Sequence, residues 1–182
     1  MNSDSLQVGN HTFTWGSRTY VMGILNITPD SFSGDGILSQ SDAVRVAVEQ
    51  ASNFLASGAD VLDVGGESTR PGSQPVNADE EVERILPVIE AVANEFPDAV
   101  ISIDTYKARV AEAAFRAGAH LLNDVWGLRA DPQLASVAAA SRVPVILMHN
   151  RSNPASVEVR AQLGNAYIGS TYKNLMEDVR RE

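Results

Sequence analysis

The chain has 182 residues, 44% of them hydrophobic, so it can bury a sizeable core and has the size of one domain. It has no cysteine, which excludes disulfides and thiolate metal sites, and its formal net charge of −9 argues against binding to nucleic acid. Met1 to Gln7 show no signal-peptide pattern, and no apolar run approaches the roughly 20 residues of a membrane helix. These features predict a cytoplasmic protein without nucleic-acid or membrane partners.

A short β-hairpin is predicted at the amino terminus, within residues 1–18. Leu6 to Val8 and Thr12 to Trp15 flank Gly9 and Asn10, two residues that accept positive φ and therefore favour a tight turn. We expect this hairpin to cover one end of the main sheet.

Five further apolar runs are typical of parallel strands buried on both faces, because they lack a clean alternation of polar and apolar residues. Each run ends in a polar side chain, and the carboxyl ends of parallel strands meet on one face, so the sequence predicts a ligand site there. The runs are Tyr20 to Leu25, Asp60 to Val64, Val100 to Ile103, His120 to Leu122 and Val145 to Met148. The polar residues at their ends are Asn26, Asp63, Asp104, Asn123 with Asp124, and His149 with Asn150.

Segments between these runs carry helical periodicity, with apolar residues three or four positions apart and capping residues at their ends. The first predicted helix carries Val44, Val48, Ala51 and Leu55 and ends at Gly58, and the second begins at the capping pair Asn77 and Glu80 and bends at Pro87. The third runs from Tyr106 to Ala117 and ends at Gly118. The fourth begins with Asp131 as its cap and Pro132 as its first residue, and the fifth runs from about Ala166 to Glu182.

Five βα units allow two architectures. An open five-stranded parallel sheet fits the length, whereas a closed (β/α)8 barrel typically needs about 250 residues. Length therefore favours the open sheet, and the choice depends on the motifs.

The first motif is GILNITPDSFS, from Gly23 to Ser33, in which a strand ends at Asn26 and a long loop follows. Loops of this length are often functional, although Asn26 could also cap an ordinary turn in a solvated connection. The second is DVGGESTRPG, in which paired glycines precede Ser68, Thr69 and Arg70, side chains suited to phosphate oxygens. The alternative is a loop whose Arg70 pairs with a surface acid.

The third motif is SIDT, from Ser102 to Thr105, followed one unit later by Asn123 and Asp124. Asp104 can accept hydrogen bonds from the N–H groups of an aminopyrimidine, and Asn123 offers both a donor and an acceptor. Alternatively, Asp104 and Asp124 cap the helices that follow.

In this order, from about Val21 to His149, the motifs strongly resemble dihydropteroate synthase, the folate-pathway enzyme of the pterin-binding family. The resemblance implies a TIM-type (β/α)8 barrel, with the hairpin at 1–18 and the first five βα units at 19–182 of a pterin-binding domain that is incomplete at its carboxyl terminus. It implies condensation of 6-hydroxymethyl-7,8-dihydropterin diphosphate with p-aminobenzoate, giving 7,8-dihydropteroate and pyrophosphate.

The resemblance also assigns roles to residues. Asn26 matches an asparagine that helps hold Mg²⁺ on the diphosphate, and Asn26, Arg70 and Asp104 are the expected catalytic residues. Loops that match Thr28 to Ser39 and Thr69 to Pro71 close over the site in the family. The expected substrate-binding residues are Asp63, Thr69, Arg70, Pro71, Asp104, Asn123 and Met148.

Three family motifs have no match here: Asp-Pro-Gly-x-Gly-Phe-Gly-Lys, Ser-Arg-Lys-Ser and Arg-x-His-Asp. The resemblance therefore predicts an amino-terminal fragment that is inactive alone. The family homodimer uses carboxyl-terminal helices that are likewise unmatched, which argues against that dimer for this chain. Two alternatives are an inactive pterin-binding remnant and a pterin-dependent methyltransferase domain, and the Ser68 to Pro71 segment favours the synthase.

Overall fold

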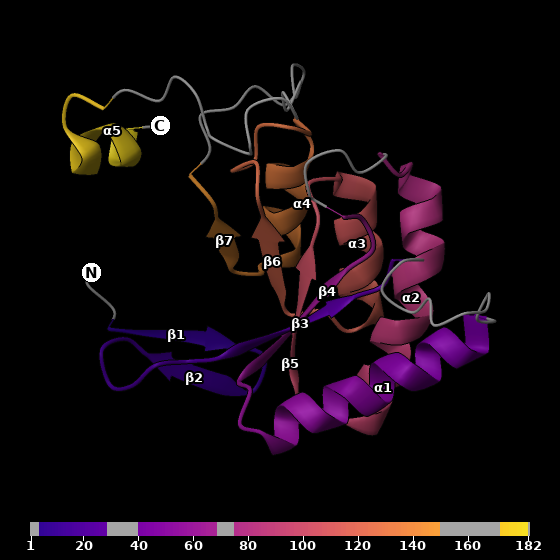
Figure 1. The fold of residues 1–182 in the computed structure, drawn as a ribbon. Helices are drawn as coiled ribbons and strands as arrows, with labels where there is room; N and C mark the ends of the chain where they lie inside the picture. The colour runs from indigo at the N-terminus through magenta and orange to yellow at the C-terminus, as the bar shows by residue number, and fades with distance from the viewer. Residues whose placement is uncertain (1–3, 29–39, 69–74, 150–171, 182) are drawn as a thin grey trace, which may run out of the picture.

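The structure of the chain is a computed structural model that describes residues 4–28, 40–68, 75–149 and 172–181 (Figure 1). Its main sheet has five parallel strands in chain order, each followed by a helix. The strands are β3 (Met22–Asn26), β4 (Val61–Gly65), β5 (Val100–Asp104), β6 (Leu121–Asp124) and β7 (Val145–Leu147). The helices are α1 (Gln40–Ala56), α2 (Ala78–Glu95), α3 (Ala108–Ala117), α4 (Leu134–Ser141) and α5 (Leu175–Arg181).

The fold is α/β, and the prediction of five βα units is confirmed. Helices α1 to α4 pack against one another in chain order along one face of the sheet (Figure 1). The apolar core lies between these helices and the sheet, where Leu62, Ile101 and Ile103 are fully buried. Strand β4 lies between β3 and β5, and every one of its residues is buried.

The predicted hairpin is also confirmed. Strands β1 (Ser5–Val8) and β2 (His11–Thr14) pair antiparallel, and Gly9 at the turn has φ of 55°. Val8 and Phe13 pack against Val61, Val100 and Leu121, the first residues of β4, β5 and β6. The hairpin therefore closes the amino ends of the strands and leaves the carboxyl ends for a ligand.

Local signals set most helix ends. The Asn77 side chain accepts a hydrogen bond from the Glu80 amide at 2.9 Å, which caps α2 as predicted. Gly58 and Gly118, with φ of 92° and 117°, follow α1 and α3 in the left-handed conformation that ends a helix. Helix α2 continues through Pro87, and the predicted bend there stays a prediction.

Two helices begin later than predicted within the described residues. Helix α4 begins at Leu134 rather than at Asp131, because the Asp131 carboxylate and carbonyl accept from the amides of Gln133 and Leu134 and hold residues 131–133 in a turn before the helix. The same carboxylate also accepts from the Ala108 amide at the start of α3. The predicted start of the last helix near Ala166 lies outside the described residues. Residues 172–174 are not helical and the helix begins at Leu175, since the Asp178 carboxylate accepts from the amides of residues 173 and 174 and holds them outside the helix.

No helix among the described residues combines the length and apolarity needed to cross a lipid bilayer.

Candidate functional site

The polar strand ends lie in one line across the sheet. In the strand register Asn26 is opposite Gly65, Gly65 is opposite Asp104, and Asp104 is opposite Asn123. Asp63 and Ser102 are opposite each other two positions earlier on β4 and β5. The structure therefore brings Asn26, Asp104 and Asn123 to one edge of the sheet, with Asp63 one level below them.

Asp63 orients Asn123. The amide nitrogen of Asn123 donates to Oδ2 of Asp63 at 3.0 Å, which directs the Asn123 carbonyl oxygen away from this contact. Asp63 is only 3% exposed, and its Oδ1 and the Ser102 hydroxyl have no hydrogen-bond partner of good geometry within the described residues. Burial raises the pKa of Asp63, and the neighbouring Ser102 and Asn123 side chains oppose this rise.

Asp104 is the most strongly perturbed acid of the site. Burial raises its pKa to about 7, and the negative charges of Asp63, Glu81, Asp124 and Glu67 add to the effect. Its carboxylate accepts no hydrogen bond from the described part of the chain, and a Cβ on the facing Gly65 would lie 3.7 Å from Asp104 Oδ2. Asp104 is thus an acceptor at the strand ends whose charge changes near neutral pH.

Asn26 and Met148 lie at the carboxyl ends of the two outer strands of the described sheet. Asn26 is exposed, and Met148 is 42% exposed and follows β7 directly. The described residues form no group of three or more His, Cys, Asp or Glu side chains that could hold a metal. A single amide oxygen such as that of Asn26 fits Mg²⁺ only where phosphate oxygens and water complete its coordination.

Asp124 and the histidines have contacts of their own. The fully buried Asp124 carboxylate accepts from the Trp126 amide at 2.8 Å and from the Leu128 amide, so Asp124 fixes the turn after β6. Helix α4 begins only at Leu134, so Asp124 does not cap it as the capping alternative proposed. His11 and His120 bond backbone groups near the amino end of β5 and so have a structural role away from the carboxyl ends of the strands. His149 contacts the Tyr172 ring, at 5.8 Å between centroids.

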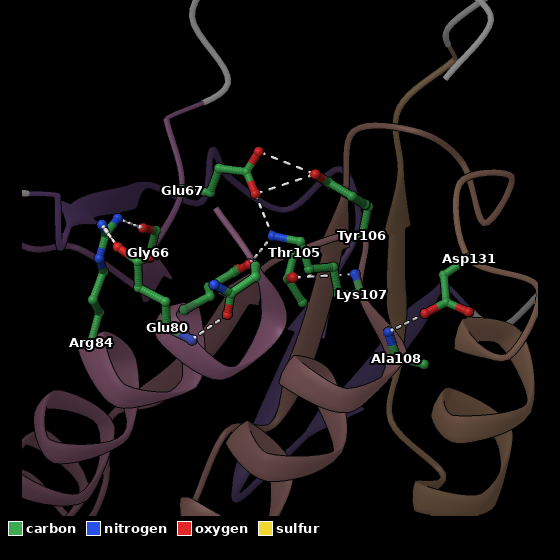
Figure 2. Close-up of polar contacts among 11 residues, drawn as sticks. Gly66, Glu67, Glu80, Arg84, Thr105, Tyr106, Lys107, Ala108 and Asp131 are labelled. Carbon is green, nitrogen blue, oxygen red and sulfur yellow. Dashed lines mark hydrogen bonds and ion pairs between the residues drawn. The ribbon is translucent and has the colours of Figure 1, made fainter. Parts of the chain in front are cut away.

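Residues Thr69, Arg70 and Pro71 lie outside the described residues, as does most of the loop after Thr28. A second polar cluster beside the site, which the sequence did not predict, is formed by Glu67, Glu81, Tyr106 and Lys107 (Figure 2). Its only sequence signal is that Glu67 lies inside the second motif and that Lys107 follows Asp104 by three residues.

A parallel α/β fold with acid and amide side chains converging at the strand ends defines a small-molecule-binding enzyme domain. The chain belongs to the pterin binding enzyme family, whose model matches residues 22–181. It is 48% identical to the dihydropteroate synthase of Clostridium beijerinckii over 174 residues, which are 96% of this chain and 57% of that protein.

Solved structures agree with the family assignment. Dihydropteroate synthase from Clostridium difficile, determined in the presence of pteroic acid, matches with a TM-score of 0.77 at 44% identity, over 93% of this chain and 57% of that one. The Xanthomonas albilineans enzyme with 4-aminobenzoic acid matches with a TM-score of 0.73 at 42% identity, over 83% and 54%. These neighbours are TIM barrels, which supports the barrel over the open sheet. The chain spans about half the length of the curated relatives it matches.

Proposed function

We propose that this chain carries the pterin-binding part of a dihydropteroate synthase site. In that reaction 6-hydroxymethyl-7,8-dihydropterin diphosphate and p-aminobenzoate give 7,8-dihydropteroate and pyrophosphate. The observation that carries the proposal is the alignment of Asp104 and Asn123 on adjacent strand ends, with Asp63 fixing the Asn123 amide. The two structural neighbours, one determined in the presence of pteroic acid and the other with 4-aminobenzoic acid, support substrates of this kind.

Asp104 and Asn123 recognise the ring edge that bears N–H groups. The ionised Asp104 carboxylate accepts from the amino group and the adjacent ring N–H of the pterin, a two-point contact that a neutral amide could not make in full. Asn123 presents its carbonyl oxygen to another ring N–H, because its nitrogen is already bound to Asp63. Met148, partly exposed at the end of β7, supplies apolar contact to the ring.

The reaction requires positioning more than a strong base. The bond between the pterin methylene carbon and the diphosphate oxygen breaks with its electron pair on the diphosphate, and the amine nitrogen of p-aminobenzoate bonds to that carbon and loses a proton. Asn26 would contribute one amide oxygen to a Mg²⁺ ion held with the diphosphate, and such an ion would supply neutralisation of the charge on the leaving group. The hydroxyl of Thr69 and the guanidinium of Arg70, which precede Pro71, suit phosphate oxygens, and we assign these residues to substrate binding.

Calorimetric titration of the purified 182-residue chain with the pterin diphosphate tests the proposal. We expect saturable binding that Asp104→Ala weakens at least tenfold at pH 7.5. Asp98→Ala is the matched control, since the exposed Asp98 lies near the amino end of the same strand, and we expect it to bind normally. Equal binding by all three proteins, or none by the parent chain, would contradict the proposal.

The alternative of a pterin-dependent methyltransferase has a separate test. The chain would then bind 5-methyltetrahydrofolate more tightly than the pterin diphosphate and support methyl transfer to a corrinoid partner. We expect the opposite order of affinity and no methyl transfer, because the polar segment after β4 suits phosphate oxygens.

A further inference from the structure

A buried ion-pair cluster lies close enough to Asp104 for its glutamates to act on that carboxylate. Figure 2 shows Glu67, Tyr106 and Lys107 of this cluster. The Lys107 ammonium donates to the carboxylates of both Glu67 and Glu81, and the Tyr106 hydroxyl donates to Glu67 at 3.1 Å. The side chains of Lys107, Glu67 and Glu81 are 15%, 13% and 1% exposed. Glu67 follows β4, Glu81 belongs to α2 and Lys107 precedes α3, so one ammonium group joins three elements.

The charges in this cluster depend on one another. Burial alone lowers the pKa of Lys107, but the ion pairs with Glu67 and Glu81 outweigh it and raise the pKa. Burial raises the pKa of Glu81, and the contact with Lys107 opposes that rise. Lys107 therefore stays positively charged, and its ammonium group is paired with both glutamate carboxylates. It is poorly placed to bind a ligand anion itself.

The segment that Lys107 holds is fixed from its other side as well. Arg84 of α2 donates to the carbonyl oxygen of Gly66 at 2.9 Å. A Cβ on Gly66 would lie 2.8 Å from Ile85 Cγ2 and 2.9 Å from Glu81 Cγ, so only glycine allows this approach to α2. The chain after β4 is thus held by α2 at Gly66 and by Lys107 at Glu67, directly before Ser68.

We propose that Lys107 is a positioning residue for recognition of the diphosphate. It ties Glu67, one residue before Ser68, to the segment that begins with Asp104, and so fixes the direction in which the chain leaves β4 relative to the pterin-binding carboxylate. Lys107 acts through Glu67 and does not touch the ligand. This inference rests on the proposed function, in which Asp104 binds the pterin, and on the hydroxyl of Ser68, directly after Glu67, which suits a phosphate oxygen.

Two ligands separate this role from general stabilisation: 6-hydroxymethyl-7,8-dihydropterin and its diphosphate, each titrated into the full 182-residue chain. The parent chain should prefer the diphosphate. In Lys107→Met this preference should fall at least tenfold while the affinity for the pterin without diphosphate changes less than twofold. Lys107→Arg should keep most of the preference, because a guanidinium can also bridge two carboxylates.

The chain offers a matched control, since its only other lysine is the exposed Lys173. Lys173→Met removes the same charge and should leave both affinities unchanged. Should Lys107→Met fail to fold, Glu67→Gln keeps the Lys107 to Glu81 pair and should cause a smaller loss in the same direction. An equal loss for both ligands, or an unchanged preference, would overturn the inference. A parent chain that binds neither ligand would overturn the proposed function and this inference with it.

Discussion

Asp104→Asn should change how the stability of the protein depends on pH. The pKa of Asp104 is raised from 3.8 to about 7 in the folded chain, first by burial and then by the charges of Asp63, Glu81, Asp124 and Glu67. Between about pH 4 and pH 7 the folded protein therefore holds a proton that the unfolded chain has released, so its stability falls as pH rises through this range. Linkage gives this group a loss of about 2.5 kcal/mol in the free energy of unfolding between pH 5 and pH 8.

Urea denaturation at several pH values, followed by the fluorescence of Trp15 and Trp126, measures this effect. The asparagine variant cannot ionise, so its free energy of unfolding should fall less than that of the parent chain by about 2.5 kcal/mol over the same range. Asp63 and Glu81 also have raised pKa values and remain in both proteins, so the difference between the two profiles reports Asp104 together with its coupling to these two groups. Parallel profiles would refute the reasoning.

Three further predictions concern stability and activity. Gly66→Ala should lower the free energy of unfolding, measured by urea denaturation, by about 1 to 3 kcal/mol, because the added Cβ would clash with Ile85 and Glu81. Gly16→Ala is the control: its Cβ would meet no atom within 4 Å, so this variant reports only the strain of a positive φ. Asn77→Ala should cost about 1 kcal/mol by the same measurement through loss of the α2 cap, and an unchanged midpoint would show that the cap contributes nothing. The 182-residue chain should not release pyrophosphate from the pterin diphosphate and p-aminobenzoate, because the lysine and Arg-x-His motifs of the family are not in its sequence; turnover in a coupled phosphate assay would contradict this.

The alternation of strands and helices and the alignment of Asn26, Asp104 and Asn123 followed from the sequence. Parallel strands put their carboxyl ends on one edge, so a polar residue at each strand end is a sufficient signal. The choice between an open sheet and a barrel did not follow from periodicity, because buried parallel strands have the same apolar pattern in both.

Contacts between distant segments had no such signal. Lys107 meets Glu67 and Glu81 across 40 and 26 positions, and Asn123 meets Asp63 across 60, so only the folded arrangement pairs them. The late start of α5 has the same kind of cause, since the Asp178 carboxylate competes for backbone amides that the apolar stripe assigned to the helix.

The affinity for 6-hydroxymethyl-7,8-dihydropterin diphosphate as a function of pH tests the central claim most directly, namely that Asp104 binds the pterin as a carboxylate. With a pKa of about 7, the carboxylate is mostly protonated at pH 6 and mostly ionised at pH 8. The parent chain should therefore bind about tenfold more weakly at pH 6 than at pH 8. Asp104→Asn should bind weakly at both values. The same affinity at pH 6 and pH 8 in the parent chain, or full affinity in the variant, would contradict the account.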